Sequence, residues 1–180
     1  MRQAKNIRER DMHIVKALAA AALLVASPAL ADEDPVYSDD LVAECVNLAE
    51  TEADMRACAG VSAEACQNAS DYGSTTIGLQ ECAALETKFW DEWLNRSYRE
   101  LLARAKAADA EAENDPRANG ELAESLRDMQ RIWINFRDAT CEYEANQYQG
   151  GTIAGPVYAG CLLRMTADQA IYLDNSWPTY

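Results

Sequence analysis

The amino-acid sequence predicts an all-α fold, a small helical bundle with two long antiparallel helices and a C-terminal helix, stapled by disulfides. Two observations carry this prediction. Apolar residues recur at spacings of three to five over two long stretches that a short connection separates, which is the pattern of amphipathic helices. In addition, six cysteines follow a segment with the features of an export signal, and an even number of cysteines in an exported chain predicts disulfides.

Residues 1–31 have the layout of a cleaved signal peptide. Five Lys and Arg residues come first, the apolar run 17–26 follows, and small residues precede the expected cleavage after Ala31. The apolar run is too short to span a bilayer. Translation from Met1 or from Met12 leaves the same mature chain. We therefore expect a periplasmic or secreted protein with no membrane anchor.

Removal of the signal makes the remaining chain strongly acidic. The signal holds five of the 16 Lys and Arg residues and two of the 30 Asp and Glu residues, so residues 32–180 keep 11 basic and 28 acidic residues, a net charge of −17. This charge disfavours nucleic acid, whose phosphates would be repelled. His13, the single histidine, belongs to the signal, which excludes Ser-His-Asp and Cys-His catalysis and His-containing metal sites.

The sequence predicts no enzyme activity, no cofactor and no metal site. It contains no phosphate-binding loop, dinucleotide fingerprint or EF-hand loop. A carboxylate pair of the glycosidase type leaves no sequence signature, so an enzyme of that kind is the competing interpretation.

The six cysteines are expected to form three disulfides. Spacing alone does not choose among their 15 possible pairings. The preferred set joins sequence neighbours across turns: Cys45–Cys58, Cys66–Cys82 and Cys141–Cys161. A zinc site or a reactive thiol is the alternative, and the chain has neither a C-x-x-C pair nor a histidine beyond the signal to support it.

Residues 32–65 are expected to form an acidic N-terminal tail and short helices. Ser38 is placed to cap a helix over 39–50, with acidic residues in its first turn. Further short helices are expected over 52–59 and 62–69, and residues 70–78 have the composition of a loop.

The first long helix is expected over 78–112. Its apolar face holds Leu79, Cys82, Leu85, Phe89, Trp93, Leu94, Tyr98, Leu101, Leu102 and Ala105. Asn114-Asp115-Pro116 ends this helix and starts the next, since Pro is tolerated at a first helical position.

The second long helix is expected over 117–147, followed by a Gly-rich turn at 150–155 and a last helix from Pro156 to about Leu173. The short connection predicts that the two long helices pack antiparallel, with the last helix across them. The inner face of the second helix holds Leu122, Leu126, Met129, Trp133, Phe136, Thr140 and Cys141.

Two segments are more specific than an amphipathic pattern. Each places its residues on one helix face by spacings of three and four. Their apolar neighbours favour a structural role, and Asn95 is expected to face the core. Four polar residues are expected to satisfy one another across the helix pair: Asn95, Gln130, Arg137 and Asp91. Arg137 is expected to pair with Asp91 or Glu144. The segments are Asp91-x-x-Leu94-Asn95-x-x-Tyr98 and Gln130-x-x-Trp133-x-x-x-Arg137-Asp138-x-x-Cys141.

With these segments, the chain resembles the N-terminal domain of the LprI-type lysozyme inhibitors, which are exported bacterial proteins. Cys82, the two segments, Gly150-Gly151 and Cys161 carry the resemblance, which covers about 66–173. It implies a helical domain over 66–180 that forms one globular domain with the preceding segment, and the region of Cys45 and Cys58 is an addition to it. It also implies inhibition of lysozyme outside the cytoplasm.

The charge agrees with a basic lysozyme as the partner, because a protein of net charge −17 attracts a basic protein at long range. The alternative is a non-enzymatic periplasmic binding module for another cationic envelope protein. Binding residues often lie on loops, so the expected contact surface is the loop of Tyr148, Gly150, Gly151, Thr152 and Ile153, or else the acidic turn at 109–115. The sequence does not indicate an oligomeric state.

Overall fold

The computed structural model describes residues 35–113, 115, 117 and 120–178. Its contacts divide the chain into two units, Met1–Asp32 and Glu33–Tyr180, of which only the second contains described residues. The predicted signal peptide, and part of the predicted turn at 114–116, lie outside the described residues. The described residues form six α-helices and no strand, which confirms the all-α prediction: α1 (Asp40–Leu48), α2 (Glu52–Ala57), α3 (Val61–Asn68), α4 (Thr76–Ala112), α5 (Leu122–Asn146) and α6 (Ala154–Asn175).

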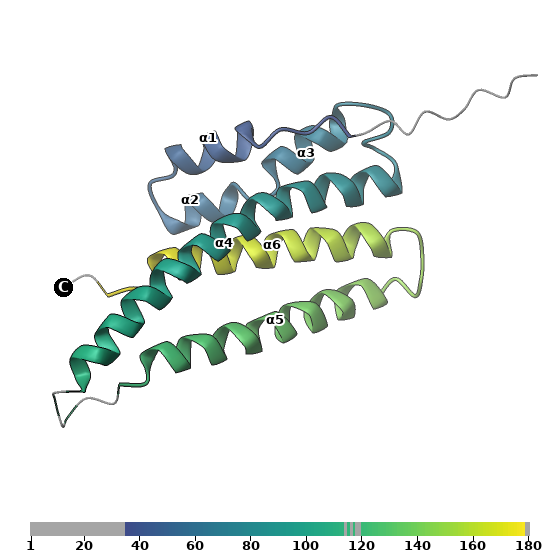
Figure 1. The fold of residues 1–180 in the computed structure, drawn as a ribbon. Helices are drawn as coiled ribbons and strands as arrows, with labels where there is room; N and C mark the ends of the chain where they lie inside the picture. The colour runs from purple at the N-terminus through teal and green to yellow at the C-terminus, as the bar shows by residue number, and fades with distance from the viewer. Residues whose placement is uncertain (1–34, 114, 116, 118–119, 179–180) are drawn as a thin grey trace, which may run out of the picture. The chain divides into compact units, whose positions relative to one another are not determined.

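The most extensive helix contact joins α4 to α6, and α5 packs more on α6 than on α4. Figure 1 shows α4 and α5 running antiparallel with α6 between them, and α1–α3 on the other side of α4. The expectation that the last helix crosses the two long ones is therefore wrong, because α6 lies along both of them. Ala167 and Ala170 are fully buried on α6, and their small side chains allow the close approach of neighbouring helices.

Aromatic residues of α4 fill the centre of the core. Trp90 is fully buried, and its ring stacks on that of Trp93 with 5.4 Å between centroids. Phe89 meets Trp90 edge to face, also at 5.4 Å. Trp90 is absent from the apolar face expected from the sequence, although it is the largest fully buried side chain among the described residues.

Three disulfides hold neighbouring helices together, and they join the pairs that the sequence analysis preferred. Cys45–Cys58 joins α1 to the residue after α2, Cys66–Cys82 joins α3 to α4, and Cys141–Cys161 joins α5 to α6. The Cα atoms of each pair lie 5.4–5.7 Å apart, an ordinary separation for a disulfide.

A buried carboxylate supports the start of α3. Glu86 of α4 is fully buried, and it accepts hydrogen bonds from the backbone N–H groups of Gly60 at 2.6 Å and Ala63 at 2.7 Å. The indole Nε1 of Trp90 donates to it at 3.0 Å. Glu86 thus satisfies two of the N–H groups that a helix leaves unpaired at its N-terminus, and its negative charge suits the positive end of the helix dipole.

Tyr37 lies before α1 and donates its hydroxyl to Asp39 at 2.7 Å. Burial and this hydrogen bond raise the pKa of the Tyr37 phenol far above its usual range, and the charges of Asp39 and Glu86 act in the same direction. Asp39, rather than Ser38, is the N-cap residue of α1, although the Ser38 hydroxyl accepts a bond from the N–H of Asp40.

The helix α5 begins at Leu122 instead of residue 117 because its start is fixed from α4. The carboxylate of Asp109 accepts hydrogen bonds from the N–H groups of Leu122 at 2.8 Å and Ala123 at 2.9 Å. One predicted inner-face residue of α5 lies outside instead, because Phe136 is 61% exposed. Leu122 is 46% exposed, but it lines a recess together with residues of α4. Among the described helices, α4 and α6 are the two that pack closely on α5, so a smaller part of its circumference is buried than the apolar pattern predicts.

Candidate functional site

A groove of about 410 Å³ runs between α4 and α5, and most of the residues of the two sequence segments line it. We call it the α4–α5 groove. Its lining residues are Asp91, Leu94, Asn95, Tyr98, Arg127, Gln130, Arg131, Trp133, Ile134 and Arg137. The structure therefore brings the two segments together, as the sequence analysis expected, but around a surface groove and not only inside a core.

The α4 side of the groove combines a buried anchor with polar side chains. Leu94 is 4% exposed, whereas Asp91 and Asn95 are exposed. The Asn95 amide donates to the backbone O and to the carboxylate Oδ2 of Asp91, both at 2.8 Å. The prediction that Asn95 faces the core is wrong, because its side chain finds its partners one turn back on its own helix.

On the α5 side, Gln130 is 8% exposed, and its Oε1 accepts a hydrogen bond from Gln169 of α6 at 2.9 Å. The Arg137 guanidinium pairs with Asp138 at 2.8 Å and lies 5.0 Å from the ring centroid of Trp133, in cation–π contact. Arg137 thus pairs with its sequence neighbour, and the predicted pair with Asp91 or Glu144 is wrong.

Glu144 instead accepts from Arg164 of α6, at 3.0 Å. The four polar residues that were expected to satisfy one another therefore do not bond across α4 and α5, and among them Asn95 and Asp91 alone bond to each other in the described structure, within α4. Gln130 bonds to α6, Arg137 bonds within α5, and Asn95 bonds within α4.

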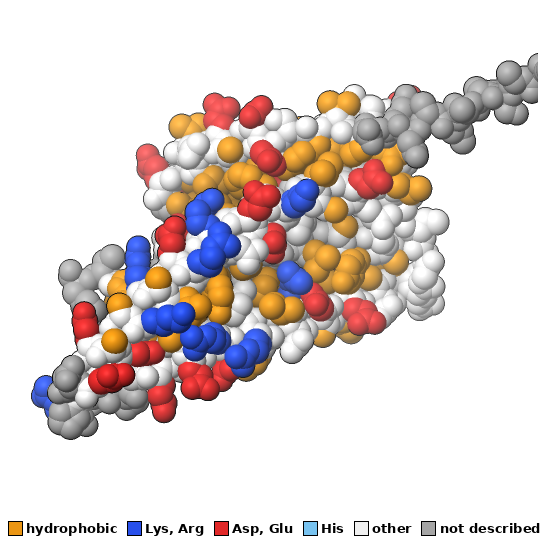
Figure 2. Space-filling model, in the orientation of Figure 1, with side chains coloured by type: hydrophobic (Ala, Val, Ile, Leu, Met, Phe, Trp, Pro, Cys, Tyr) orange, Lys and Arg blue, Asp and Glu red, His pale blue; other side chains and the backbone are white. Residues whose placement is uncertain are grey.

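Three arginines line this groove in a chain that is otherwise acidic. Figure 2 shows Lys and Arg side chains gathered on one face, along α4 and between α4 and α5. Arg131 pairs with Asp128 at 2.6 Å, and 70% of its side chain is exposed. Arg127 and Arg137 are half-buried. Arg127, Arg131 and Ile134 lie outside the residues singled out from the sequence. Arg127 and Ile134 are three and four residues from Gln130, which places them on its face, and Arg131 is four residues from Arg127 and three from Ile134.

The chemistry of the groove is that of binding. Guanidinium, aromatic and amide groups recognise carboxylates and planar or polar partners. Within the described part of the chain, no three His, Cys, Asp or Glu side chains come together in a way that would hold a metal ion. None of the described helices has the length and apolar character needed to cross a membrane.

The loop predicted as a contact surface connects α5 to α6 (Figure 1), and none of its residues lines the α4–α5 groove. Tyr148 is 49% exposed and Ile153 is 44% exposed. Gln149 and Gly150 take the left-handed backbone conformation, with φ of 51° and 77°. Gly150, Gly151 and Thr152 are exposed. The candidate contact residues therefore form a surface of their own.

Residues 66–173 match the family described as lysozyme inhibitor LprI. This chain belongs to the LprI family. The matched span contains α4, α5, the loop after α5 and nearly all of α6, so it includes the whole α4–α5 groove. The disulfide Cys45–Cys58 precedes it. The description of the LprI family names an inhibitor and not an enzyme.

Two curated proteins are similar to this LprI-family chain. An uncharacterized protein of Rhizobium meliloti (strain 1021) is 32% identical over 90 residues, 50% of this chain and 65% of that protein. An uncharacterized 17.7 kDa protein from the region 5′ of puhA in Rhodobacter capsulatus is 28% identical over 137 residues, 73% of this chain and 82% of that protein. The chain thus spans less than two thirds of the Rhizobium relative. No solved structure matches it.

Proposed function

We propose that this protein is an exported inhibitor of lysozyme that acts by stoichiometric binding and not by catalysis. The observation that carries the proposal is the LprI match over residues 66–173, whose span contains every residue that lines the α4–α5 groove. Inhibition of this kind requires only that a rigid surface cover the target. Disulfides and a packed core supply that rigidity.

The charge distribution suits a basic glycosidase. The net charge of −17 on residues 32–180 attracts a basic protein and accelerates its association. A glycosidase cleft holds two carboxyl groups, and arginine is the side chain that pairs best with carboxylates. Three of the 11 basic residues in 32–180 line the α4–α5 groove, so its arginines can face the cleft while acidic residues face the basic exterior of the target.

We propose the α4–α5 groove as the first contact surface and the loop of Tyr148, Gly150, Gly151, Thr152 and Ile153 as the second. The groove is favoured because it combines Trp133 and Tyr98 with arginines, and aromatic residues and arginine dominate the energy of protein interfaces. The loop offers exposed Tyr148 and Ile153 on a connection that the disulfide Cys141–Cys161 anchors.

The experiment is a titration of cell-wall lysis by a basic lysozyme with the oxidised 32–180 protein, at low and at moderate salt. We expect one-to-one inhibition that persists at moderate salt. Inhibition that vanishes with salt would indicate only a polyanion attracting a polycation, because screening removes long-range attraction between exposed charges.

Three exposed isoleucines distinguish the two surfaces. Ile134 is 41% exposed and lines the groove, Ile153 is 44% exposed in the loop, and Ile132 is 68% exposed on α5 outside the groove. We expect Ile134→Glu to weaken inhibition at least about tenfold, as loss of an interface anchor does, and Ile132→Glu to leave it unchanged. If Ile153→Glu weakens inhibition and Ile134→Glu does not, the contact surface is the loop.

We also propose that residues 1–31 are removed as a signal peptide, that residues 32–65 are an addition to the LprI-type domain, and that the product is periplasmic or secreted. The basic start, the apolar run and the small residues before Ala31 support this processing. Mass spectrometry of the protein from a cell-envelope fraction should give a chain that begins at Asp32. A chain that retains residues 1–31 there would contradict the proposal.

The second candidate function is a non-enzymatic periplasmic module that binds another cationic envelope protein. The acidic surface supports it equally, because attraction by charge does not select a glycosidase. Absence of inhibition at any salt concentration, across more than one lysozyme type, would make this the better proposal.

A further inference from the structure

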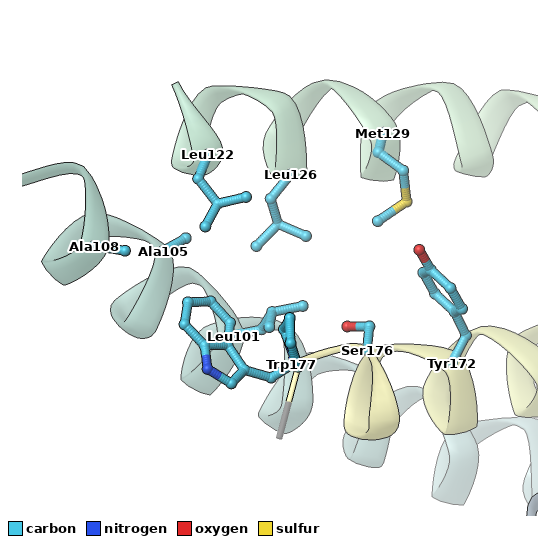
Figure 3. Close-up of a pocket in the computed structure, with 10 residues that line it drawn as sticks. Leu101, Ala105, Ala108, Leu122, Leu126, Met129, Tyr172, Ser176 and Trp177 are labelled. Carbon is cyan, nitrogen blue, oxygen red and sulfur yellow. The ribbon is translucent and has the colours of Figure 1, made fainter. Parts of the chain in front are cut away.

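A second hollow lies where the last part of α4 and the start of α5 meet the segment after α6. Its volume is about 690 Å³, and it shares no lining residue with the α4–α5 groove. Figure 3 shows Leu122 and Leu126 of α5 facing Leu101 and Ala105 of α4, with Trp177 beside them. We call it the apolar cavity.

The packing of the helices explains why this space is not filled. The Asp109 carboxylate fixes the start of α5 on α4 through the N–H groups of Leu122 and Ala123. Opposite Leu122 stand the small side chains of Ala105 and Ala108, which are too short to fill the gap (Figure 3). Leu122 therefore remains 46% exposed although it lines a recess between helices.

The walls of the apolar cavity carry few polar atoms. None of the described side chains that line it is charged. Its hydroxyl groups belong to Tyr172 and Ser176, both on the α6 side (Figure 3). A pocket of about 300–1,000 Å³ with apolar walls and a small number of polar groups is the usual form of a small-molecule site.

The charges around the apolar cavity limit which head group a ligand can carry. Asp109 and Glu121 lie in the adjoining hollow beside Leu122 and Ala108. A further small hollow, which Leu101 and Trp177 also line, holds the acidic residues Glu100 and Asp174 and the basic residue Arg104. Acidic side chains outnumber basic ones in both hollows, which opposes an anionic head group.

We propose that the apolar cavity binds one acyl chain of a single-chain zwitterionic lipid, a lysophospholipid whose head group carries no net charge. The recess lies between three segments, so it admits a chain and not a flat bilayer surface. The net charge of −17 on residues 32–180 also opposes an anionic membrane. This site is separate from the proposed inhibitory surface, so each can fail without the other.

The test uses myristoyl lysophosphatidylcholine below its micelle concentration, with the oxidised 32–180 protein in a calorimeter. We expect saturable one-to-one binding, and binding of myristate about fivefold weaker, since the acidic side chains beside the apolar cavity repel its carboxylate. A brominated chain should quench tryptophan fluorescence, and Trp177→Phe should reduce that quenching while the heat of binding remains.

Two neighbouring alanines of α4 provide a matched pair of variants. Ala108 lines the apolar cavity, whereas Ala107 is exposed on the same helix and does not line it. We expect Ala108→Phe to weaken lipid binding at least about tenfold, because an aromatic side chain occupies the space that the ligand needs. Ala107→Phe should bind like the parent, and thermal unfolding of both variants checks that they fold.

Three outcomes would overturn the proposal. The lipid associates only above its micelle concentration, or a folded Ala108→Phe variant binds it like the parent. Alternatively, sedimentation shows a dimer that Ala108→Phe abolishes and that the lipid does not dissociate, in which case a second copy of the chain covers the apolar cavity.

Discussion

Replacing Glu86 by leucine should destabilise this protein more than almost any change on its surface. Glu86 is fully buried, and its carboxylate accepts hydrogen bonds from Gly60, Ala63 and Trp90. Leucine has a similar size and leaves the packing nearly filled. The substitution therefore removes the acceptor and keeps the three donors in place.

The magnitude follows from those donors. A buried donor without a partner costs about 1–3 kcal/mol, and the three costs are not additive because the donors share one site. Relief from burying a charge offsets part of the loss. We expect a net loss of about 3–5 kcal/mol in the free energy of unfolding, which lowers the melting temperature by about 10–15 °C in a chain of this size.

Thermal unfolding followed by circular dichroism, with the disulfides oxidised, measures this loss. The matched control is Glu92→Leu on the same helix, whose side chain is exposed and should change stability by no more than about 0.5 kcal/mol. Glu86→Gln keeps one oxygen acceptor and should fall between the two. A Glu86→Leu variant within about 1 kcal/mol of the parent would refute the reasoning, since the donors would then be satisfied without the carboxylate.

Other positions give further predictions. Gly78→Ala should destabilise, because a Cβ there would collide with the backbone of the preceding loop, while Gly160→Ala meets nothing within 4 Å and should stabilise α6 by about 0.5–1 kcal/mol in urea unfolding. Because the pKa of Tyr37 is raised, the folded state keeps a proton that the unfolded state loses above about pH 10. The free energy of unfolding should therefore fall as pH rises beyond that value, and it should fall less in Tyr37→Phe. Replacing Cys45 and Cys58 by Ala should lower the free energy of unfolding by about 3 kcal/mol in the same urea assay. A reduced chain that unfolds cooperatively at the midpoint of the oxidised parent would contradict this prediction.

Helix positions were predictable from the sequence because their signals are local. The first long helix was expected over 78–112 and is Thr76–Ala112, and the last helix differs by two residues at each end from the expected Pro156–Leu173. Apolar periodicity and punctuation by Gly and Pro act over a few residues, so one sequence suffices to locate them. The start of α5 was misplaced because Asp109, which fixes it, belongs to another helix.

The partners of polar residues were not predictable in the same way. Glu86 looks like one more surface carboxylate in an acidic chain, and its backbone donors lie 26 and 23 residues earlier. Asn95 and Arg137 sit at helical positions that suggest contact across α4 and α5, but each is satisfied within its own helix. Helical spacing determines which residues share a face, whereas the packing of α6 between the long helices determines which faces are buried.

The three disulfides enclose separate stretches of the sequence that do not overlap or nest, with separations of 13, 16 and 20 residues. In a chain that enters an oxidising compartment with its N-terminus first, both cysteines of one pair arrive before either cysteine of the next. Each bridge can then close before a cysteine from another pair competes for it. The order of the cysteines along the chain thus favours native pairing during translocation and lessens the need for later disulfide exchange.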